Sequence, residues 1–159
     1  MYWNINITKI TKNIYVSNGP TAKNEEYLLK ENFNIVINTA IDLSDYFKKK
    51  ELDYYNSKIK NSKIKYYDFG IKDDNNTNLK PKIFSIARII NYNIIQNPNI
   101  KILINCCMGL SRSVSMVAGY LILKQNMDPL DAIYFIKSKR LNSFTNKNFV
   151  NQLLKLKNI

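Results

Sequence analysis

The sequence predicts an α/β fold in which a central, mostly parallel sheet of about four to five strands is flanked by helices. Short runs of β-branched and apolar residues alternate with longer segments whose apolar residues recur at the helical period. The 159 residues, of which 45% are hydrophobic and 23% charged, suit one compact domain with a buried core. Neither an internal repeat nor a linker rich in Pro, Gly or Ser divides the chain, so residues 1–159 are expected to form a single domain.

Four short segments have the composition of strands. The first is Ile14–Ser17, and the turn signal Asn18-Gly19-Pro20 closes it. Residues 34–39 and 63–69 follow, each a short run of β-branched, aromatic and apolar residues. The fourth is the run 101–105, which is apolar enough to be a central, buried strand.

The remaining periodic segments predict helices. Thr21 is expected to cap a short helix with acids in its first turns. Residues 79–96 repeat Ile at the spacing of an amphipathic helix. Three more helices are expected: one from about Ser111, one over 129–139 that opens with Pro, and one from about Asn146.

Two features of the composition exclude several chemistries. The chain has no histidine, which removes Ser-His-Asp and Cys-His catalysis, histidine-ligated zinc and histidine pH switches. The only cysteines, Cys106 and Cys107, are adjacent, so they can neither link distant parts of the chain nor supply a four-cysteine metal site. We therefore expect a reducing compartment, the cytoplasm. Consistent with this, the sequence shows no signal peptide and no run of roughly 20 apolar residues that could span a membrane.

The charge of the chain is strongly positive. Lys and Arg exceed Asp and Glu by 24 − 12 = 12, which gives a formal net charge of +12. This charge favours polyanionic partners or phosphorylated, acidic substrates without choosing among them. Lysine runs such as 48–50 are most simply solvated faces, although they would also attract acidic phosphoproteins at long range.

Residues 104–113 combine the end of a strand, a loop and the start of a helix. The apolar strand ends at Asn105, the loop begins at Cys106, and the helix begins at or near Arg112. A loop wrapped over a helix N-terminus directs several backbone N–H groups at one point, where the helix dipole adds positive potential. Arg112 can complete this cradle with a planar fork that matches two phosphate oxygens.

A thiol at the base of such a cradle is suited to nucleophilic attack. The surrounding dipoles and charge stabilise the thiolate and lower its pKa, so Cys106 would lie ionised beneath a bound phosphoryl group. The alternative is that both cysteines are small buried hydrophobes. For Cys107 we expect loop packing, or at most a redox partner for Cys106.

The pattern Cys106-x5-Arg112-Ser113 resembles the phosphate-binding loop of cysteine-dependent protein phosphatases, and its context resembles their small dual-specificity class, of the poxvirus-type or atypical kind. The resemblance covers nearly the whole chain, including an ending over residues 145–153 that is similar to the family's. It implies hydrolysis of phosphotyrosine and phosphoserine or phosphothreonine through a phosphocysteine intermediate, with neither a metal nor an organic cofactor. The phosphate-binding residues that it implies are Cys107, Met108, Gly109, Leu110, Ser111 and Arg112.

The resemblance also implies a carboxylic acid upstream of the loop, which protonates the leaving oxygen. Two candidates, Asp73 and Asp74, stand together in a polar loop. The family places its acid six residues before the aliphatic residue that opens the next helix, and counting back from Leu79 selects Asp73. Asp74 stays as the alternative acid, and Asp68 is expected to be a strand-end residue.

Three polar residues around the nucleophile have expected roles. In the family, the hydroxyl that corresponds to Ser113 binds the cysteine sulfur and helps it leave, whereas Ser111 is either a support for the loop or an ordinary helix cap. Asn105 departs from the pattern, because the family has histidine there. Since asparagine cannot carry positive charge, we expect a higher Cys106 pKa than is usual for the class and a pH optimum shifted upward.

The substrate and partners are only partly indicated. The uncharged loop positions Cys107, Met108 and Leu110 favour a phosphorylated protein over a phosphoinositide, because relatives specialised for lipid head groups tend to carry extra lysines there. A non-catalytic phosphate-binding scaffold, favoured by Asn105, and an RNA 5′-triphosphatase, favoured by the net charge, stay open. The sequence does not choose between a monomer and a homodimer.

Overall fold

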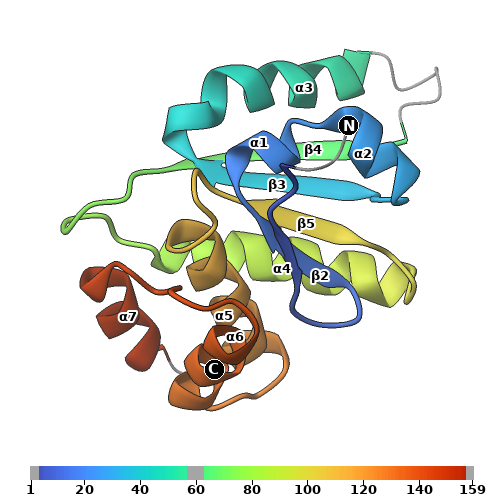
Figure 1. Ribbon diagram of the computed structural model, residues 1–159. Helices are drawn as coiled ribbons and strands as arrows, with labels where there is room; N and C mark the ends of the chain where they lie inside the picture. Colours follow the sequence, from blue (N-terminus) through green and yellow to red (C-terminus); the bar gives the residue numbers. More distant parts are fainter. Residues whose placement is uncertain (1–3, 57–62, 157–159) are drawn as a thin grey trace.

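The computed structural model describes residues 4–56 and 63–156 of the chain (Figure 1). Its strands are β1 (Ile7–Lys9), β2 (Ile14–Ser17), β3 (Ile35–Ala40), β4 (Lys65–Ile71) and β5 (Ile102–Asn105). They form one five-stranded sheet in the order β1-β2-β5-β3-β4. All neighbours are parallel except β1, which pairs antiparallel with β2. The predicted α/β class with a mostly parallel sheet is confirmed.

Helices cover both faces of this sheet (Figure 1). Their bounds are α1 (Gly19–Ala22), α2 (Glu25–Lys30), α3 (Ser44–Asn56), α4 (Lys80–Gln96), α5 (Arg112–Lys124), α6 (Pro129–Lys139) and α7 (Lys147–Leu154), and a 3₁₀ turn over Ile41–Leu43 precedes α3. The first three helices lie on one face, whereas α4 and α5 pack on the other, with α6 and α7 beyond α5.

The alternation of side chains along the strands divides the core into two layers. In β3, Ile35 and Ile37 belong to the larger hydrophobic cluster beside α4 and α5, whereas Val36 belongs to the smaller one beneath α2 and α3. Every residue of α5 from Arg112 to Leu123 is buried, so this helix is the centre of the larger layer. The short apolar runs that predicted strands are therefore continuous because the sheet is covered on both sides.

The helix predicted after the first turn differs in detail. Thr21 does not cap it: the chain forms two short helices instead, with the side chain of Asn18 capping α1 and that of Asn24 capping α2. Thr21 is buried within α1, and its hydroxyl accepts a hydrogen bond from the backbone N–H of Asn6. Asparagine is a better N-cap than threonine, so the asparagines on either side of Thr21 cap the two helices.

Two elements were not predicted, and one residue was misplaced. The edge strand β1 has only three residues, and α3 buries only Ser44 and Phe47, so neither carries a strong periodic signal. Asp68 is not at a strand end: it lies inside β4, in register with Asn38 of β3.

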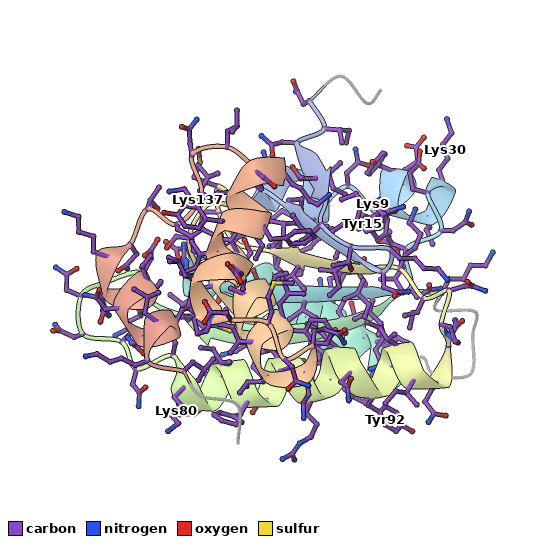
Figure 2. The ribbon with its side chains drawn as sticks, turned by 90° about the horizontal axis from the view of Figure 1, so that it is seen from below. Lys9, Tyr15, Lys30, Lys80, Tyr92 and Lys137 are labelled. Carbon is purple, nitrogen blue, oxygen red and sulfur yellow. The ribbon has the colours of Figure 1, made fainter. Side chains whose placement is uncertain are left out.

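The lysines are dispersed over the molecule. Lys9, Lys30, Lys80 and Lys137 come from β1, α2, α4 and α6 and point outward at separate places (Figure 2). Several other lysines lie over aromatic rings, as Lys101 does over Phe33 at 4.5 Å from the ring centroid. Within residues 4–56 and 63–156, no helix is long and apolar enough to cross a membrane.

Candidate active site

The loop over residues 106–111 joins β5 to α5 at the carboxyl end of the parallel strands. Gly109 has a φ of +73° in this loop, a conformation that L side chains rarely adopt. A Cβ at this position would lie 2.7 Å from the Ser17 carbonyl oxygen and 2.6 Å from Arg140 Nη2. Glycine is therefore required here both by the backbone turn and by the closeness of the neighbouring strand.

Cys106 lies at the base of the loop and is 2% exposed. Its Sγ is 3.2 Å from the Ser113 hydroxyl oxygen and accepts a hydrogen bond of 3.2 Å from the Gly109 N–H. Burial alone would raise the pKa of the Cys106 thiol, but hydrogen bonds from the Ser113 hydroxyl and from the amides of Ser113 and Ser111, together with the Arg112 charge, lower it. These contacts stabilise the thiolate form of Cys106, and Ser113 lies where its hydroxyl can donate to the sulfur.

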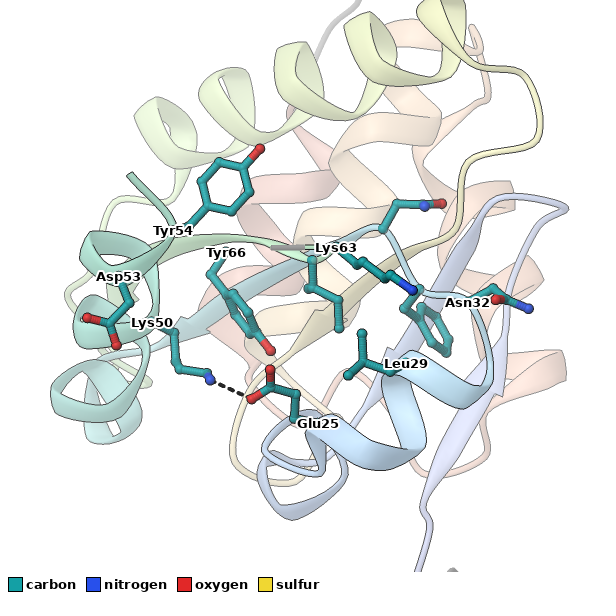
Figure 3. Close-up of a pocket in the computed structure, with 11 residues that line it drawn as sticks. Glu25, Leu29, Asn32, Lys50, Asp53, Tyr54, Lys63 and Tyr66 are labelled. Atoms are coloured by element: carbon teal, nitrogen blue, oxygen red, sulfur yellow. Dashed lines mark hydrogen bonds and ion pairs between the residues drawn. The ribbon is translucent and has the colours of Figure 1, made fainter. Parts of the chain in front are cut away.

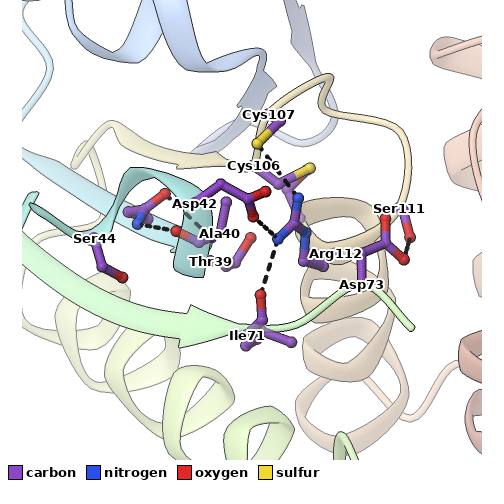
Figure 4. Close-up of polar contacts among 12 residues, drawn as sticks. Thr39, Ala40, Asp42, Ser44, Ile71, Asp73, Cys106, Cys107, Ser111 and Arg112 are labelled. Carbon is purple, nitrogen blue, oxygen red and sulfur yellow. Dashed lines mark hydrogen bonds and ion pairs between the residues drawn. The ribbon is translucent and has the colours of Figure 1, made fainter. Parts of the chain in front are cut away.

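Arg112 is oriented by groups on one edge of its guanidinium (Figure 4). Nη1 donates to Asp42 Oδ1 at 2.6 Å and to the Ile71 carbonyl oxygen at 2.9 Å, while Nη2 lies 3.4 Å from Cys107 Sγ. Nε is buried and has no partner among residues 4–56 and 63–156. Nε and Nη2 form the edge that can bind two oxygens of one phosphate. The ion pair with Asp42 is made by Nη1, so it leaves this edge available apart from the hydrogen bond that Nη2 donates to Cys107 Sγ.

The two upstream carboxylates have different surroundings. Asp73 Oδ1 accepts hydrogen bonds from the Ser111 hydroxyl at 3.0 Å and from Asn146 Nδ2 at 2.7 Å, which joins it to the loop and to the start of α7. Asp74 turns away and closes its own loop, where hydrogen bonds from the Thr77 hydroxyl and the amides of Asn76 and Thr77 lower its pKa. Of the two, Asp73 is the one in contact with the phosphate-binding loop, and Asp74 is held as an anion.

A match to a family model extends over residues 14–159, and its description is dual specificity phosphatase, catalytic domain. The chain belongs to this family. Human dual specificity protein phosphatase 9 is 28% identical over 146 residues, a stretch that is 92% of this chain and 35% of that protein. This chain therefore spans about a third of the length of that relative.

The solved structures of the family share the fold. The crystal structure of human tyrosine phosphatase-like serine/threonine/tyrosine-interacting protein matches with a TM-score of 0.77 and 18% identity, over 94% of each chain. OH1 from the Orf virus, described as a tyrosine phosphatase with triple substrate specificity, matches with a TM-score of 0.69 and 21% identity, over 94% of this chain and 85% of that one. At these identities the likeness establishes the fold of this dual specificity phosphatase domain.

Arg140 is a second buried arginine of this phosphatase domain, and the sequence analysis did not identify it. It is the C-cap residue that follows α6, and it donates from Nε to the Gly109 carbonyl oxygen at 2.6 Å and from Nη2 to that of Met108 at 3.1 Å. Its other donors reach Thr8 Oγ1 at 2.8 Å and Asn6 Oδ1 at 2.6 Å. By binding two loop carbonyls from outside, Arg140 favours the backbone orientation in which the N–H groups face the phosphate.

The other loop residues differ in exposure. Met108 is 67% exposed, and Leu110 accepts hydrogen bonds at its carbonyl oxygen from the N–H groups of Phe144 and Thr145. Cys107 is half-buried, and burial raises the pKa of its thiol, in contrast to that of Cys106. The Ser111 hydroxyl donates a hydrogen bond to Asp73, and the Ser111 side chain makes no capping hydrogen bond to the backbone of α5. This supports a role for Ser111 in the loop over that of an ordinary helix cap.

Pockets near and far from the loop have different chemistry. A shallow pocket of about 540 Å³ borders Asp73, between the acid loop and the start of α7. Another, of about 660 Å³, lies between α2, α3 and the strands they cover (Figure 3). There Glu25 and Lys50 neutralise each other in a 2.5 Å ion pair, and burial raises the pKa of Tyr66. Neither Lys50, which is paired, nor Tyr66, whose phenol is kept protonated, is activated as a nucleophile in this second pocket.

Proposed function

We propose that this domain is a phosphoprotein phosphatase that hydrolyses phosphotyrosine and phosphoserine or phosphothreonine through a phosphocysteine intermediate. Membership of the dual specificity phosphatase family supports this reaction class. The observation that carries the proposal is the placing of an activated Cys106 thiol at the base of the loop together with the unpartnered Nε of Arg112. This arrangement offers a nucleophile and an anion-binding fork to the same phosphoryl group.

In the first step, the phosphate monoester binds to the loop N–H groups and to Nε and Nη2 of Arg112. The Cys106 thiolate attacks phosphorus, a sulfur–phosphorus bond forms, and the bond from phosphorus to the ester oxygen breaks. The electron pair of that bond stays on the leaving oxygen, which takes a proton from the carboxylic acid of Asp73. Asp73 is supported in this role over Asp74 because it accepts a hydrogen bond from Ser111 of the loop.

In the second step, water attacks phosphorus and gives a proton to the Asp73 carboxylate. The sulfur–phosphorus bond breaks, its electron pair returns to Cys106, and inorganic phosphate leaves. The Ser113 hydroxyl, 3.2 Å from Cys106 Sγ, donates a hydrogen bond to the sulfur as its negative charge returns. No metal or organic cofactor takes part in the proposed reaction.

The proposed substrate is a phosphorylated protein. The exposed Met108 side chain and the uncharged Cys107 and Leu110 give the loop no lysine with which to bind the further phosphates of an inositol head group. The lysines of Figure 2 lie on separate elements, which gives less support to one continuous RNA-binding face. We also infer a single catalytic domain and a reducing, cytoplasmic location, in which both cysteines stay free.

A chromogenic ester and a phosphopeptide panel test this function. Wild-type protein should hydrolyse para-nitrophenyl phosphate and phosphopeptides, and Cys106→Ser should abolish turnover. The matched control Cys107→Ser should retain it, because burial raises the pKa of that thiol. Tight phosphopeptide binding without turnover by the wild type would indicate a scaffold, and faster release of γ-phosphate from triphosphate-ended RNA than of phosphate from peptides would indicate an RNA triphosphatase.

A further inference from the structure

A row of buried polar side chains crosses the sheet directly behind the phosphate-binding loop. Ser17 of β2, Asn105 of β5, Asn38 of β3 and Asp68 of β4 are register partners in turn, one on each parallel strand. The first three are 0% exposed. These strands lie side by side in Figure 1, so the row runs from beside the nucleophile toward the far edge of the sheet.

Three members of the row are joined by side-chain hydrogen bonds with one direction. Asn105 Nδ2 donates to Asn38 Oδ1 at 3.0 Å, and Asn38 Nδ2 donates to Asp68 Oδ1 at 2.7 Å. The hydroxyl of Ser44, at the start of α3, also donates to Asp68 Oδ1, at 3.2 Å. Ser17 stands outside this chain, because its hydroxyl donates to the backbone oxygen of Asn18.

The direction of the chain is set at Asn38, by Asp68 and by the main chain of Ala40. The Ala40 carbonyl oxygen accepts a hydrogen bond from Asn38 Nδ2 at 2.9 Å, and the Ala40 N–H donates to Asn38 Oδ1 at 3.2 Å. A carboxylate only accepts hydrogen bonds, so Asn38 must turn its amide nitrogen toward it. The Asn38 oxygen then faces Asn105, which must in turn present its own nitrogen. Asn105 Oδ1 is left buried without a partner among the described parts of the chain, which shows that its orientation is imposed by its neighbour.

The same residue is held through its main chain. The Thr39 hydroxyl donates at 2.8 Å to the carbonyl oxygen of Asn105, which belongs to the peptide group that carries the Cys106 N–H. The side chain and the main chain of Asn105 are therefore both held, and together they fix the peptide group between Asn105 and Cys106. A shift of this peptide would move Cys106 relative to Arg112 and the loop amides.

We propose that Asp68 is a positioning residue for the nucleophile: together with the Ala40 main chain it orients Asn38, and through Asn38 it orients Asn105 and the start of the phosphate-binding loop. Asp68 touches neither substrate nor sulfur, and it acts through two amides. The inference rests on the proposed function of Cys106, and it assigns a role to Asn105 at the position where the family's pattern has histidine.

The test is the pH dependence of Cys106 alkylation by iodoacetamide, with and without inorganic phosphate as a protecting anion. Asp68→Asn can present either an oxygen or a nitrogen to Asn38, so the direction of the chain loses its carboxylate support and keeps only the hydrogen bonds to the Ala40 main chain. We expect the alkylation midpoint to move upward and the phosphate concentration for half-protection to rise about tenfold, the order expected for a slightly misplaced site. Removing a negative charge without moving the loop would shift the midpoint downward, so the sign separates positioning from a field effect.

The charged or titratable groups in electrostatic contact with Cys106 are Arg112, Arg140 and Cys107, and all three are retained in every variant. Asn38→Ser breaks the chain with Asp68 intact and should reproduce both changes, which keeps the proposal testable if Asp68→Asn does not fold. In an Asn105→Ala background, Asp68→Asn should have no further effect. Ser17→Ala, in the same buried row but outside the chain, should leave the midpoint and the half-protection concentration unchanged.

Additive losses in the Asn105→Ala background, or a midpoint that stays or falls in both Asp68→Asn and Asn38→Ser, would overturn the proposal. The outcome is separate from that of the proposed function. If the Asp68→Asn and Asn38→Ser variants show these alkylation effects while the wild-type protein hydrolyses no phosphate ester, the phosphatase activity is refuted and the positioning role is supported. If the wild-type protein is active but the substitutions of Asp68 and Asn38 change neither the alkylation midpoint nor the half-protection concentration, the phosphatase activity is supported and the positioning role is refuted.

Discussion

Asp42 orients the Arg112 guanidinium and so determines which of its edges would face the proposed phosphate substrate. The Asp42 side chain is 57% exposed, whereas that of Arg112 is 6% exposed, so a carboxylate on the surface orients a buried guanidinium. The hydrogen bond from Arg112 lowers the pKa of Asp42, which keeps the carboxylate charged at neutral pH. The pair is therefore a positioning contact whose value lies in its geometry more than in stability.

Asp42→Asn should raise KM for a phosphate monoester about tenfold, the order expected for losing one charge-assisted hydrogen bond, with a smaller change in kcat. Affinity is lost because the Arg112 guanidinium is no longer held in one orientation before the phosphate binds. Steady-state kinetics would measure it, with Asp45→Asn as a control that removes the same charge from the exposed start of α3. A lower KM in Asp42→Asn would mean instead that Asp42 competes with the phosphate.

The Cys106 thiol should react as an anion below the ordinary pKa of cysteine. Because its pKa is lowered, the rate of alkylation should rise with pH to a plateau that is reached earlier than for an unperturbed thiol. Activity should fall on acidification through the same midpoint, since the protonated thiol is inactive. Asn105 adds no positive charge, so this midpoint should still exceed that usual for the family.

Alkylation rates across pH, measured in Cys107→Ser so that only one thiol remains, would place the midpoint. A midpoint at or above that of free cysteine would contradict the activation of Cys106. An unusually acidic thiol would contradict the argument from Asn105.

Asp73→Asn should lower kcat about a hundredfold or more for phosphopeptides, because their leaving oxygens need a proton. The loss should be much smaller for para-nitrophenyl phosphate, whose leaving group is stable as an anion. Comparing kcat for the two substrates measures this dependence. Asp74→Asn should leave the ratio of the two rates as it is in the wild type, and the reverse pattern would assign the acid to Asp74.

Some of these residues could be found from the sequence, and others could not. Cys106, Arg112 and Ser113 share one loop, and Asp73 follows from its spacing to Leu79, so local patterns were enough to propose them. Asp42 is 70 residues from Arg112, and Arg140 is 31 residues from Gly109. Nothing in either local sequence indicates such a contact, because only the folded sheet brings these segments together.

At the scale of elements, the phosphate-binding loop is supported by segments from both ends of the chain. Arg140, at the end of α6, binds two loop carbonyls and also Asn6 and Thr8, the latter in β1. The edge strand therefore contributes to the site even though it supplies no group that would touch phosphate. The predicted turn and strand near the N-terminus gave no sign of this role.

Arg140→Lys should weaken the binding of inorganic phosphate about tenfold, because a point charge cannot replace a planar fork on several acceptors. Protection of Cys106 from alkylation by phosphate would measure the change. Arg88→Lys, on the exposed face of α4, is the matched control and should bind phosphate as the wild type does. Unchanged protection in Arg140→Lys would show that the loop holds its shape without this contact.

The success of prediction also varied by element. The strands β2, β3, β4 and β5 and the helices α4 to α7 carry strong local signals, and α6 begins and ends at the predicted residues, Pro129 and Lys139. The helix α3 was missed because its sequence is largely polar and it buries little of its surface. Such a helix is stabilised by the sheet beneath it, which no local pattern represents.

At the scale of the whole molecule, the net charge and the site have separate effects. The charge of +12 is spread over many elements, whereas the carboxylates of Asp42 and Asp73 contact Arg112 and Ser111 at the phosphate-binding loop. Long-range attraction should therefore act on the approach of an acidic substrate more than on the bound phosphoryl group.

For an acidic phosphopeptide, kcat/KM should fall several-fold between about 0.05 M and 0.5 M salt, as the screening length shrinks. For the small ester para-nitrophenyl phosphate, and for a phosphopeptide with basic flanks, the fall should be smaller. Kinetics of the three substrates across one salt series would measure this. Equal salt dependence for all of them would refute steering by the net charge.

Arg112 begins the helix that is buried on every side through Leu123. An innermost helix has no easy local route to solvent, so its amide hydrogens exchange only when the entire domain opens. The anion-binding arginine is therefore anchored to the most slowly exchanging part of the fold. An anion bound in the phosphate-binding loop should slow deuterium uptake along the whole of α5 and raise the melting temperature of the domain. Binding can therefore be measured without any turnover.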